Sequence, residues 1–176
     1  MRVTTAGESH GKALVAIIEG MPAGLQLDIS AIDKQLALRQ SGYGRGARQK
    51  LESDKVEILS GVRNGVTLGS PITLAVYNRD YENWKAYMAP EGCDTQARKV
   101  TRVRPGHADL TGLKKFGGED ARNILERASA RETAVRVAAG TVCRQYLSAL
   151  GVEVAGFVRS VGSVKDEGAY SFDNIK

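Results

Sequence analysis

Cysteine and histidine are scarce in this chain, with only two of each among 176 residues. Cys93 and Cys143 lack the close spacing of zinc ligands, and the two histidines stand too far apart to complete a zinc-binding pattern. We therefore expect both cysteines to be reduced thiols, and we expect no metal site.

Long apolar runs are also missing. No stretch approaches the length of a membrane-spanning helix, and the first residues, MRVTTAGESHG, lack the apolar segment of a signal peptide. This predicts a cytoplasmic protein without a membrane partner. The hydrophobic fraction of 42% and the charged fraction of 26% are ordinary for a folded protein, and the length suffices for one domain with its own core.

Aromatic residues make up only 6% of the chain, although its net charge is +5. Nucleic-acid-binding modules usually place aromatic side chains among their basic residues for base stacking, and only Tyr43 lies among arginines here. We expect no nucleic-acid partner but keep a basic nucleic-acid-binding module as an alternative. The 15 arginines outnumber the 10 lysines, which favours bidentate binding of carboxylate or phosphate and hence a small polyanionic ligand.

Several elements in the first half can be predicted from local patterns. The apolar run 13–18 is typical of a buried strand. Ser30 and Asp33 have the spacing of a capping box and predict a helix that ends at Arg39, before a glycine-rich segment. Asn64-Gly65 predicts a hairpin turn between strands 56–62 and 66–77, the second of which needs a bulge or an edge position at Pro71.

The second half is predicted to contain one long helix. Ser129 and Glu132 have capping-box spacing, so the helix should start near Ala130 and run to about Leu150, with Gly151 as its stop. Gly140 should permit a close approach by a neighbouring element. The apolar face of this helix comprises Ala134, Val135, Ala138, Val142, Tyr146 and Leu150, and Cys143 should lie in the helix core.

We expect a long loop at 78–102, pinned by its aromatic residues, and a strand at 152–158.

Two histidines are candidates for acid–base chemistry. His10 lies in the polar loop GESHG, where it could exchange protons or could simply be a turn histidine bonded to the backbone. His107 lies in RPGHADL, where Asp109 could orient its ring; the alternative is a capped loop.

The arginines fall into two groups. Arg39, Arg45 and Arg48 could form a solvated basic face, but interleaved glycines would let backbone amides approach a ligand. Because their G-x-G-x-G pattern follows a helix, it is not a dinucleotide-binding fingerprint, and no Walker sequence is present. The second group comprises Arg104, Arg127 and Arg131. These arginines could surround the predicted helix start, where the helix terminus favours binding of an anion. Alternatively, they could pair internally with Glu119, Asp120, Glu126 or Glu132.

Five motifs in order resemble the chorismate synthase family. They cover nearly all of the chain up to Gly156 and read GESHG, GYGRGARQ, EILSGV followed by GVTLGSPI, RPGHADL, and ERASARETAVRVAAG. The resemblance implies an α+β fold, a β-α-β sandwich with long helices between antiparallel sheets, assembled as a homotetramer. It implies a lyase that converts 5-enolpyruvylshikimate 3-phosphate to chorismate and phosphate by anti-1,4-elimination with reduced FMN, as the last step of the shikimate pathway.

The resemblance also implies residue roles. His10 would be an acid near the flavin, and His107 would protonate the departing phosphate. Residues 127–129 (Arg127, Ala128 and Ser129) would contact FMN, and some family members use NADPH as flavin reductant at positions that match Arg39 and Arg45. The arginines implied to hold the anionic substrate are Arg39, Arg45, Arg48, Arg104 and Arg131.

Members of this family are considerably longer than this chain. The resemblance therefore implies that residues 1–176 form the N-terminal portion of a single domain whose C-terminal half carries further cofactor contacts. We expect the chain to be inactive alone and to need that half as partner. A non-catalytic assembly fragment is the other alternative.

Overall fold

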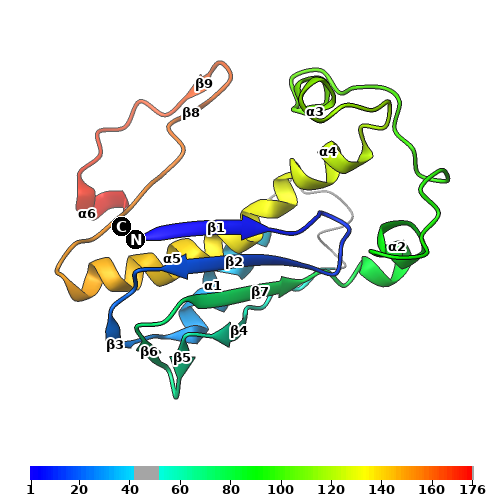
Figure 1. Ribbon diagram of the computed structural model, residues 1–176. Coiled ribbons are helices and arrows are strands. Elements are labelled where there is room, and N and C mark those ends of the chain that lie inside the picture. The colour runs from blue at the N-terminus through cyan, green and yellow to red at the C-terminus, as the bar shows by residue number, and fades with distance from the viewer. Residues whose placement is uncertain (42–51, 176) are drawn as a thin grey trace.

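The computed structural model describes residues 1–41 and 52–175 and has a mixed α+β architecture with open antiparallel sheets. Its largest sheet has four strands in the order β1-β2-β7-β4, all antiparallel, and two helices, α1 and α5, lie together behind it (Figure 1). The bounds of these elements are Arg2–Ala6 for β1, Ala13–Glu19 for β2, Ile72–Tyr77 for β7, Glu57–Ser60 for β4, Ile29–Gln40 for α1 and Thr133–Ala149 for α5.

The core forms between this sheet and the two helices. In β2 the side chains alternate: Leu14, Ala16 and Ile18 are fully or almost fully buried, whereas Ile17 is exposed on the opposite face. This confirms the buried strand predicted at 13–18. The fully buried helix residues that complete the core include Ile32, Leu36, Ala134, Val135, Ala138 and Val142.

The start of α5 differs in detail from the capping-box prediction. The Ser129 hydroxyl accepts a hydrogen bond from the Arg131 amide, but residues 130–132 form a 3-10 turn, η2, and α5 begins only at Thr133. The Glu132 carboxylate binds Thr5 and Arg136, so the expected reciprocal bond to the cap is replaced by tertiary contacts.

The far end of α5 stops as predicted, because Gly151 adopts a left-handed conformation with φ of 76°. Three expectations along α5 were wrong. Leu150 is 61% exposed, and a side chain at Gly140 would meet nothing within 4 Å, so no described element approaches there. Cys143 is only half-buried near the edge of the sheet, where its thiol lies 3.4 Å from the Met1 sulfur, and burial raises its pKa. Both cysteines are free thiols.

The cap of α1 was also predicted incorrectly. Asp28, not Ser30, receives the Ala31 amide at 3.1 Å, and α1 begins at Ile29. The Asp33 carboxylate instead accepts the Val56 amide, which anchors the chain leading into β4. The predicted helix end holds, with Arg39 in the last turn.

The Asn64-Gly65 hairpin is present, with φ of 50° and 75° at its two central residues. However, each predicted long strand is divided in two. Gly61 separates β4 from β5, and residues 69–71, including Pro71, separate β6 from β7. The pairing of β4 with β7 has a register shift between Ile58 and Ser60, opposite Leu74 and Thr73. The hairpin strands join a second sheet in the order β3-β6-β5, with bounds Ala23–Gln26 for β3, Val62–Arg63 for β5 and Val66–Leu68 for β6.

The predicted loop at 78–102 contains a helix, α2, at Tyr81–Met88, and the predicted strand at 152–158 is absent. The chain after α5 extends away from the sheet (Figure 1), and many of its apolar side chains are exposed, among them Phe157, Val158 and Phe172. The remaining elements are α3 at Asp109–Phe116, α4 at Arg122–Arg127, β8 at Ser160–Val161, β9 at Val164–Lys165 and α6 at Phe172–Ile175. No helix among the described residues is long and apolar enough to span a membrane.

Candidate active site

His10 lies in the loop between β1 and β2 and is held by a carboxylate. Its Nδ1 is 2.9 Å from both carboxylate oxygens of Glu126 at the end of α4, and its backbone amide donates to Oε2 of the same residue at 2.8 Å. The ring stacks on Trp84 of α2 with centroids 3.9 Å apart. The His10 ring is therefore engaged by side chains, unlike that of a turn histidine bonded only to backbone.

Glu126 is a buried anion. Its side chain has no exposed surface, and it also accepts a hydrogen bond from Arg122 Nη1 at 3.1 Å. Burial alone would raise its pKa, but the hydrogen bonds from His10 and Arg122 outweigh burial and hold the pKa of Glu126 below its ordinary value.

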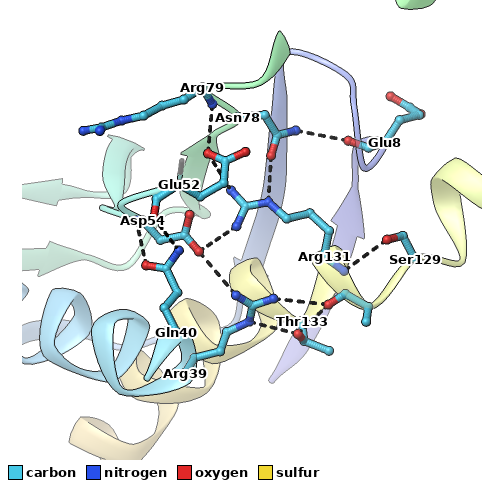
Figure 2. A network of polar contacts seen from close by, with 11 residues as sticks. Glu8, Arg39, Gln40, Glu52, Asp54, Asn78, Arg79, Ser129, Arg131 and Thr133 are labelled. Atoms are coloured by element: carbon cyan, nitrogen blue, oxygen red, sulfur yellow. Dashed lines mark hydrogen bonds and ion pairs between the residues drawn. The ribbon is translucent and has the colours of Figure 1, made fainter. Parts of the chain in front are cut away.

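Arg131 lies at the centre of a buried polar network (Figure 2). Its Nε donates to Asn78 at 2.8 Å, its Nη1 donates to the Asp54 carboxylate at 2.7 Å, and its Nη2 lies 3.8 Å from Glu52. The Arg131 side chain is only 7% exposed. Arg131 was predicted to bind substrate beside a helix start. In the structure it lies just before α5, where it faces the carboxylates of Asp54 and Glu52.

Arg39 reaches the same carboxylate from the end of α1. Its Nη1 lies 3.4 Å from Asp54 Oδ2, the oxygen that also receives Arg131, and its Nε donates to Thr133 at 3.0 Å. One aspartate thus fixes two arginines from different helices relative to each other. Within the described residues, Asp54 Oδ1 and Arg131 Nη2 have no hydrogen-bond partner, so the network retains an acceptor and a donor.

Asn78 connects this network to the loop of His10. Its side-chain amide donates to the Glu8 carbonyl at 3.2 Å and to the Gly11 carbonyl at 2.7 Å, while its oxygen receives Arg131. A side chain at the end of β7 therefore holds the arginine network and the histidine loop in one arrangement (Figure 2).

His107 lies in a second cluster with Arg104 and Asp109. The Arg104 guanidinium donates to both Asp109 oxygens at 2.8 Å and also contacts His107 Nδ1 at 3.0 Å. Because a guanidinium can only donate, this contact makes Nδ1 an acceptor and puts the proton of the neutral ring on Nε2. The predicted Asp109 contact exists at 3.4 Å but is secondary to the arginine.

The ion pair between Arg104 and Asp109 predicts that the free energy of unfolding depends on pH in the acid range. The side-chain hydrogen bond from Arg104 holds the pKa of Asp109 well below its usual range, against the opposing effect of burial. A carboxyl with a lowered folded-state pKa stabilises the fold above its unfolded pKa of about 3.9 and loses that contribution as pH falls further. Urea unfolding should therefore show Asp109→Asn to be less stable than the native chain at pH 7, with a difference that shrinks below about pH 4.

Exposed Glu91 provides the control for that measurement. Glu91→Gln should leave the dependence of unfolding on pH unchanged. A constant difference between native and Asp109→Asn chains from pH 7 down to pH 2 would contradict the assigned ion pair.

The two clusters are linked electrostatically. The hydrogen bond to Asp109 is the main cause that raises the pKa of Arg104, and the negative charge of Glu126 adds to this effect. The His107 cluster therefore lies within electrostatic reach of Glu126, the carboxylate that holds His10. The structure thus associates Arg39 and Arg131 through Asp54, the loop of His10 with Arg131 through Asn78, and the His107 cluster with Glu126 through charge. Arg45 and Arg48 lie outside the described residues.

A mainly apolar pocket of about 500 Å³ lies between α3 and α4. A side chain at Gly112 would overlap Ile124, so glycine lets the two helices approach closely. Arg127 and Ala128 line the pocket, together with Ala108, which follows His107. Ser129 is occupied as a cap, and Arg127 donates to the Thr5 hydroxyl at 2.9 Å.

Several members of these clusters were not predicted, namely Glu52, Asp54, Asn78, Trp84 as the stacking partner of His10, and Glu126 as its carboxylate partner. Of the acidic partners suggested for the arginines, only Glu132 pairs as proposed, with Arg127 at 3.5 Å. The Arg122–Glu126 spacing of four residues indicates a helical ion pair, but nothing local indicates His10. The described residues contain no group of three or more potential metal-ligating side chains close enough to hold a metal ion.

Comparison with known proteins identifies the family. The sequence profile of chorismate synthase matches residues 1–175. This chain belongs to the chorismate synthase family. It is 58% identical over 171 residues to a chorismate synthase of Symbiobacterium thermophilum, covering 94% of this chain and 44% of the relative. It is 56% identical over 176 residues to one of Caldicellulosiruptor bescii, covering 100% of this chain and 46% of the relative.

A solved chorismate synthase structure agrees in fold. It superposes with a TM-score of 0.69 at 46% sequence identity and covers 94% of this chain but 40% of the solved chain. The α+β class is thereby confirmed. This chain spans less than half the length of these curated chorismate synthases.

Proposed function

We propose that this chain forms the N-terminal half of a chorismate synthase and supplies half of its active site. The assembled enzyme eliminates phosphate and a proton from 5-enolpyruvylshikimate 3-phosphate to give chorismate. The observation that carries the proposal is the family match over residues 1–175, together with the two ordered histidine clusters and the arginine network.

The arginines suit a substrate with two carboxylates and a phosphate. Arg104 is more accessible than Arg39 and Arg131, with 38% of its side chain exposed, and it can contact an anion while holding His107. Arg39 and Arg131 keep their carboxylate partners, so we assign them mainly to shaping the wall of the site. Arg45 and Arg48 are proposed as further anion ligands.

The residues present fit a flavin in part. A pocket of about 500 Å³ falls within the range of about 300–1,000 Å³ that is common for ligand sites, and its apolar lining with a basic edge at Arg127 suits a flat aromatic ring system that carries a phosphate. Arg127 and Ala128 would hold FMN, with Ser129 behind them. Reduced FMN held there would supply electron density to the reaction as phosphate leaves. NADPH binding by Arg39 and Arg45 stays a prediction.

The histidines are placed for different proton transfers. With Nδ1 of His107 accepting from Arg104, its Nε2–H would donate a hydrogen bond to the departing phosphate. His10, with Nδ1 on Glu126, has Nε2 left for the cofactor side of the site. In both cases a charged partner fixes the ring, so that proton transfer does not require reorientation.

The C-terminal half of the family's chain is the proposed partner. The exposed apolar side chains after α5 support this, because isolated folded domains seldom leave so many uncovered in one segment; they include Val152, Val154, Phe157, Val158, Val161, Val164 and Phe172. We further propose a homotetramer for the assembled enzyme. The family match supports an enzyme rather than a nucleic-acid-binding module.

The chemistry can be tested in an anaerobic mixture of this chain with a C-terminal half from a relative. With reduced FMN and 5-enolpyruvylshikimate 3-phosphate, the mixture should produce chorismate and phosphate in equal amounts, whereas oxidised FMN should support neither. Phosphate release without chorismate would indicate a phosphatase and contradict the proposed elimination.

A further inference from the structure

We propose that Glu126 is a positioning residue that holds His10 in the tautomer protonated at Nδ1. The catalytic importance of this arrangement rests on the function proposed above, but the tautomer itself is a property of the chain. One buried carboxylate contacts both the backbone and the ring of this loop residue.

Glu126 fixes both the backbone and the ring of His10. Oε2 accepts the His10 amide at 2.8 Å, and both oxygens lie 2.9 Å from Nδ1. In addition, the Ser9 amide donates to the Glu126 carbonyl at 3.0 Å. The loop is therefore attached to the end of α4 at consecutive residues, which leaves the His10 side chain little freedom to rotate.

A carboxylate determines the tautomer because it can only accept hydrogen bonds. Glu126 remains ionised, since its pKa lies below the ordinary value, so Nδ1 of His10 must carry a proton. The neutral ring of a free histidine favours Nε2–H, and Glu126 reverses that preference. The consequence is an Nε2 lone pair, free to accept a proton in one step and return it in another.

The surroundings also restrict the orientation of the His10 ring. Trp84 covers one face of the His10 ring, and the Arg98 guanidinium carbon lies 4.7 Å from the Trp84 centroid. Arg122 donates to Glu126 and lies 5.4 Å from the same tryptophan ring. The His10 ring is thus confined between Glu126 and Trp84, which fixes the direction in which Nε2 points.

Nitrogen-15 NMR of the labelled chain tests the tautomer directly. The chain contains only two histidines, and they are expected to differ: His10 protonated at Nδ1 and His107 at Nε2. His107→Asn assigns the signals by removing one set. A neutral His10 with its proton on Nε2 in the native chain would overturn the proposal, and this result requires no turnover and no variant of Glu126.

Glu126→Gln then tests whether the carboxylate is responsible. Glutamine keeps the size but presents one acceptor and one donor, so the Nδ1–H signal of His10 should give way largely to Nε2–H. Glu119→Gln is the matched control, because the Glu119 side chain is 90% exposed and pairs only weakly with Lys99 at 3.7 Å. An unchanged His10 tautomer in folded Glu126→Gln would contradict the assigned role.

Kinetics separate positioning from folding. In the mixture with the C-terminal half, Glu126→Gln should lower kcat by about tenfold to a hundredfold, a part of the 10²–10⁴-fold usual for acid–base catalysis, with little change in KM. Glu126→Asp, which restores a carboxylate, should recover part of the loss together with the Nδ1–H signal. Recovery of neither would contradict the proposal. If the native mixture is inactive, the NMR result still decides the tautomer, so the two failures are distinguishable.

Discussion

Arg131→Ala is expected to lower the free energy of unfolding by about 3–5 kcal/mol, the usual cost of removing one partner from a buried ion pair. The guanidinium is 7% exposed and faces Asp54 and Glu52, whose side chains have almost no exposed surface. Its removal leaves both carboxylates with fewer partners in a poorly solvated space, and it removes the hydrogen bond to Asn78, the residue that holds the loop of His10. Urea unfolding monitored by circular dichroism measures the loss.

Arg136→Ala is the matched control. Arg136 also contacts a carboxylate, Glu132, at 2.6 Å, but its side chain is 62% exposed, so the expected cost is about 1 kcal/mol or less. Asp54→Asn combined with Arg131→Ala should cost clearly less than the sum of the single changes, because the two residues are in contact. Equal effects of Arg131→Ala and Arg136→Ala would contradict the buried network.

His107→Ala should lower kcat in the reconstituted enzyme by about 10²–10⁴-fold, the contribution typical of a positioned acid or base. The side chain is 30% exposed and lies on a surface loop, so the substitution should leave the fold intact. Phosphate release at saturating substrate is the measurement, with circular dichroism as the check on folding.

Lys114→Ala serves as the control because Lys114 is an exposed cation on the neighbouring helix α3. It should retain nearly full activity, which separates a loss of positive charge in this region from a loss of the imidazole. If His107→Ala kept more than about a tenth of the native kcat, the proposed proton donor would be wrong.

The sequence predicted elements whose cause is local. The apolar run of β2, the Asn64-Gly65 turn and the stop at Gly151 depend on periodicity or on backbone conformations that few residues adopt. Local competition explains the error at α1, where Asp28 offers an equally good cap two residues earlier than Ser30. Segment 152–158 has strand-like composition but makes no strand pairing within the described residues.

The site was predicted only in its basic half. Arginine and histidine candidates could be recognised from motifs, but their partners lie far away in sequence: Asp54 is 77 residues from Arg131, and Glu126 is 116 from His10. Such contacts depend on how α4, α5 and β7 pack, which a single sequence does not specify. The same reason explains Gly140, whose open surroundings follow from tertiary packing rather than from its neighbours in the chain.

The most direct test of the half-site account is anaerobic phosphate release from 5-enolpyruvylshikimate 3-phosphate with reduced FMN. It compares this chain alone, the C-terminal half of a relative alone, and the two together. The account predicts release only from the mixture, in proportion to the amount of complex formed. Turnover by this chain alone would contradict the half-site, and an inactive mixture in which both halves are folded and bound would contradict the proposed function.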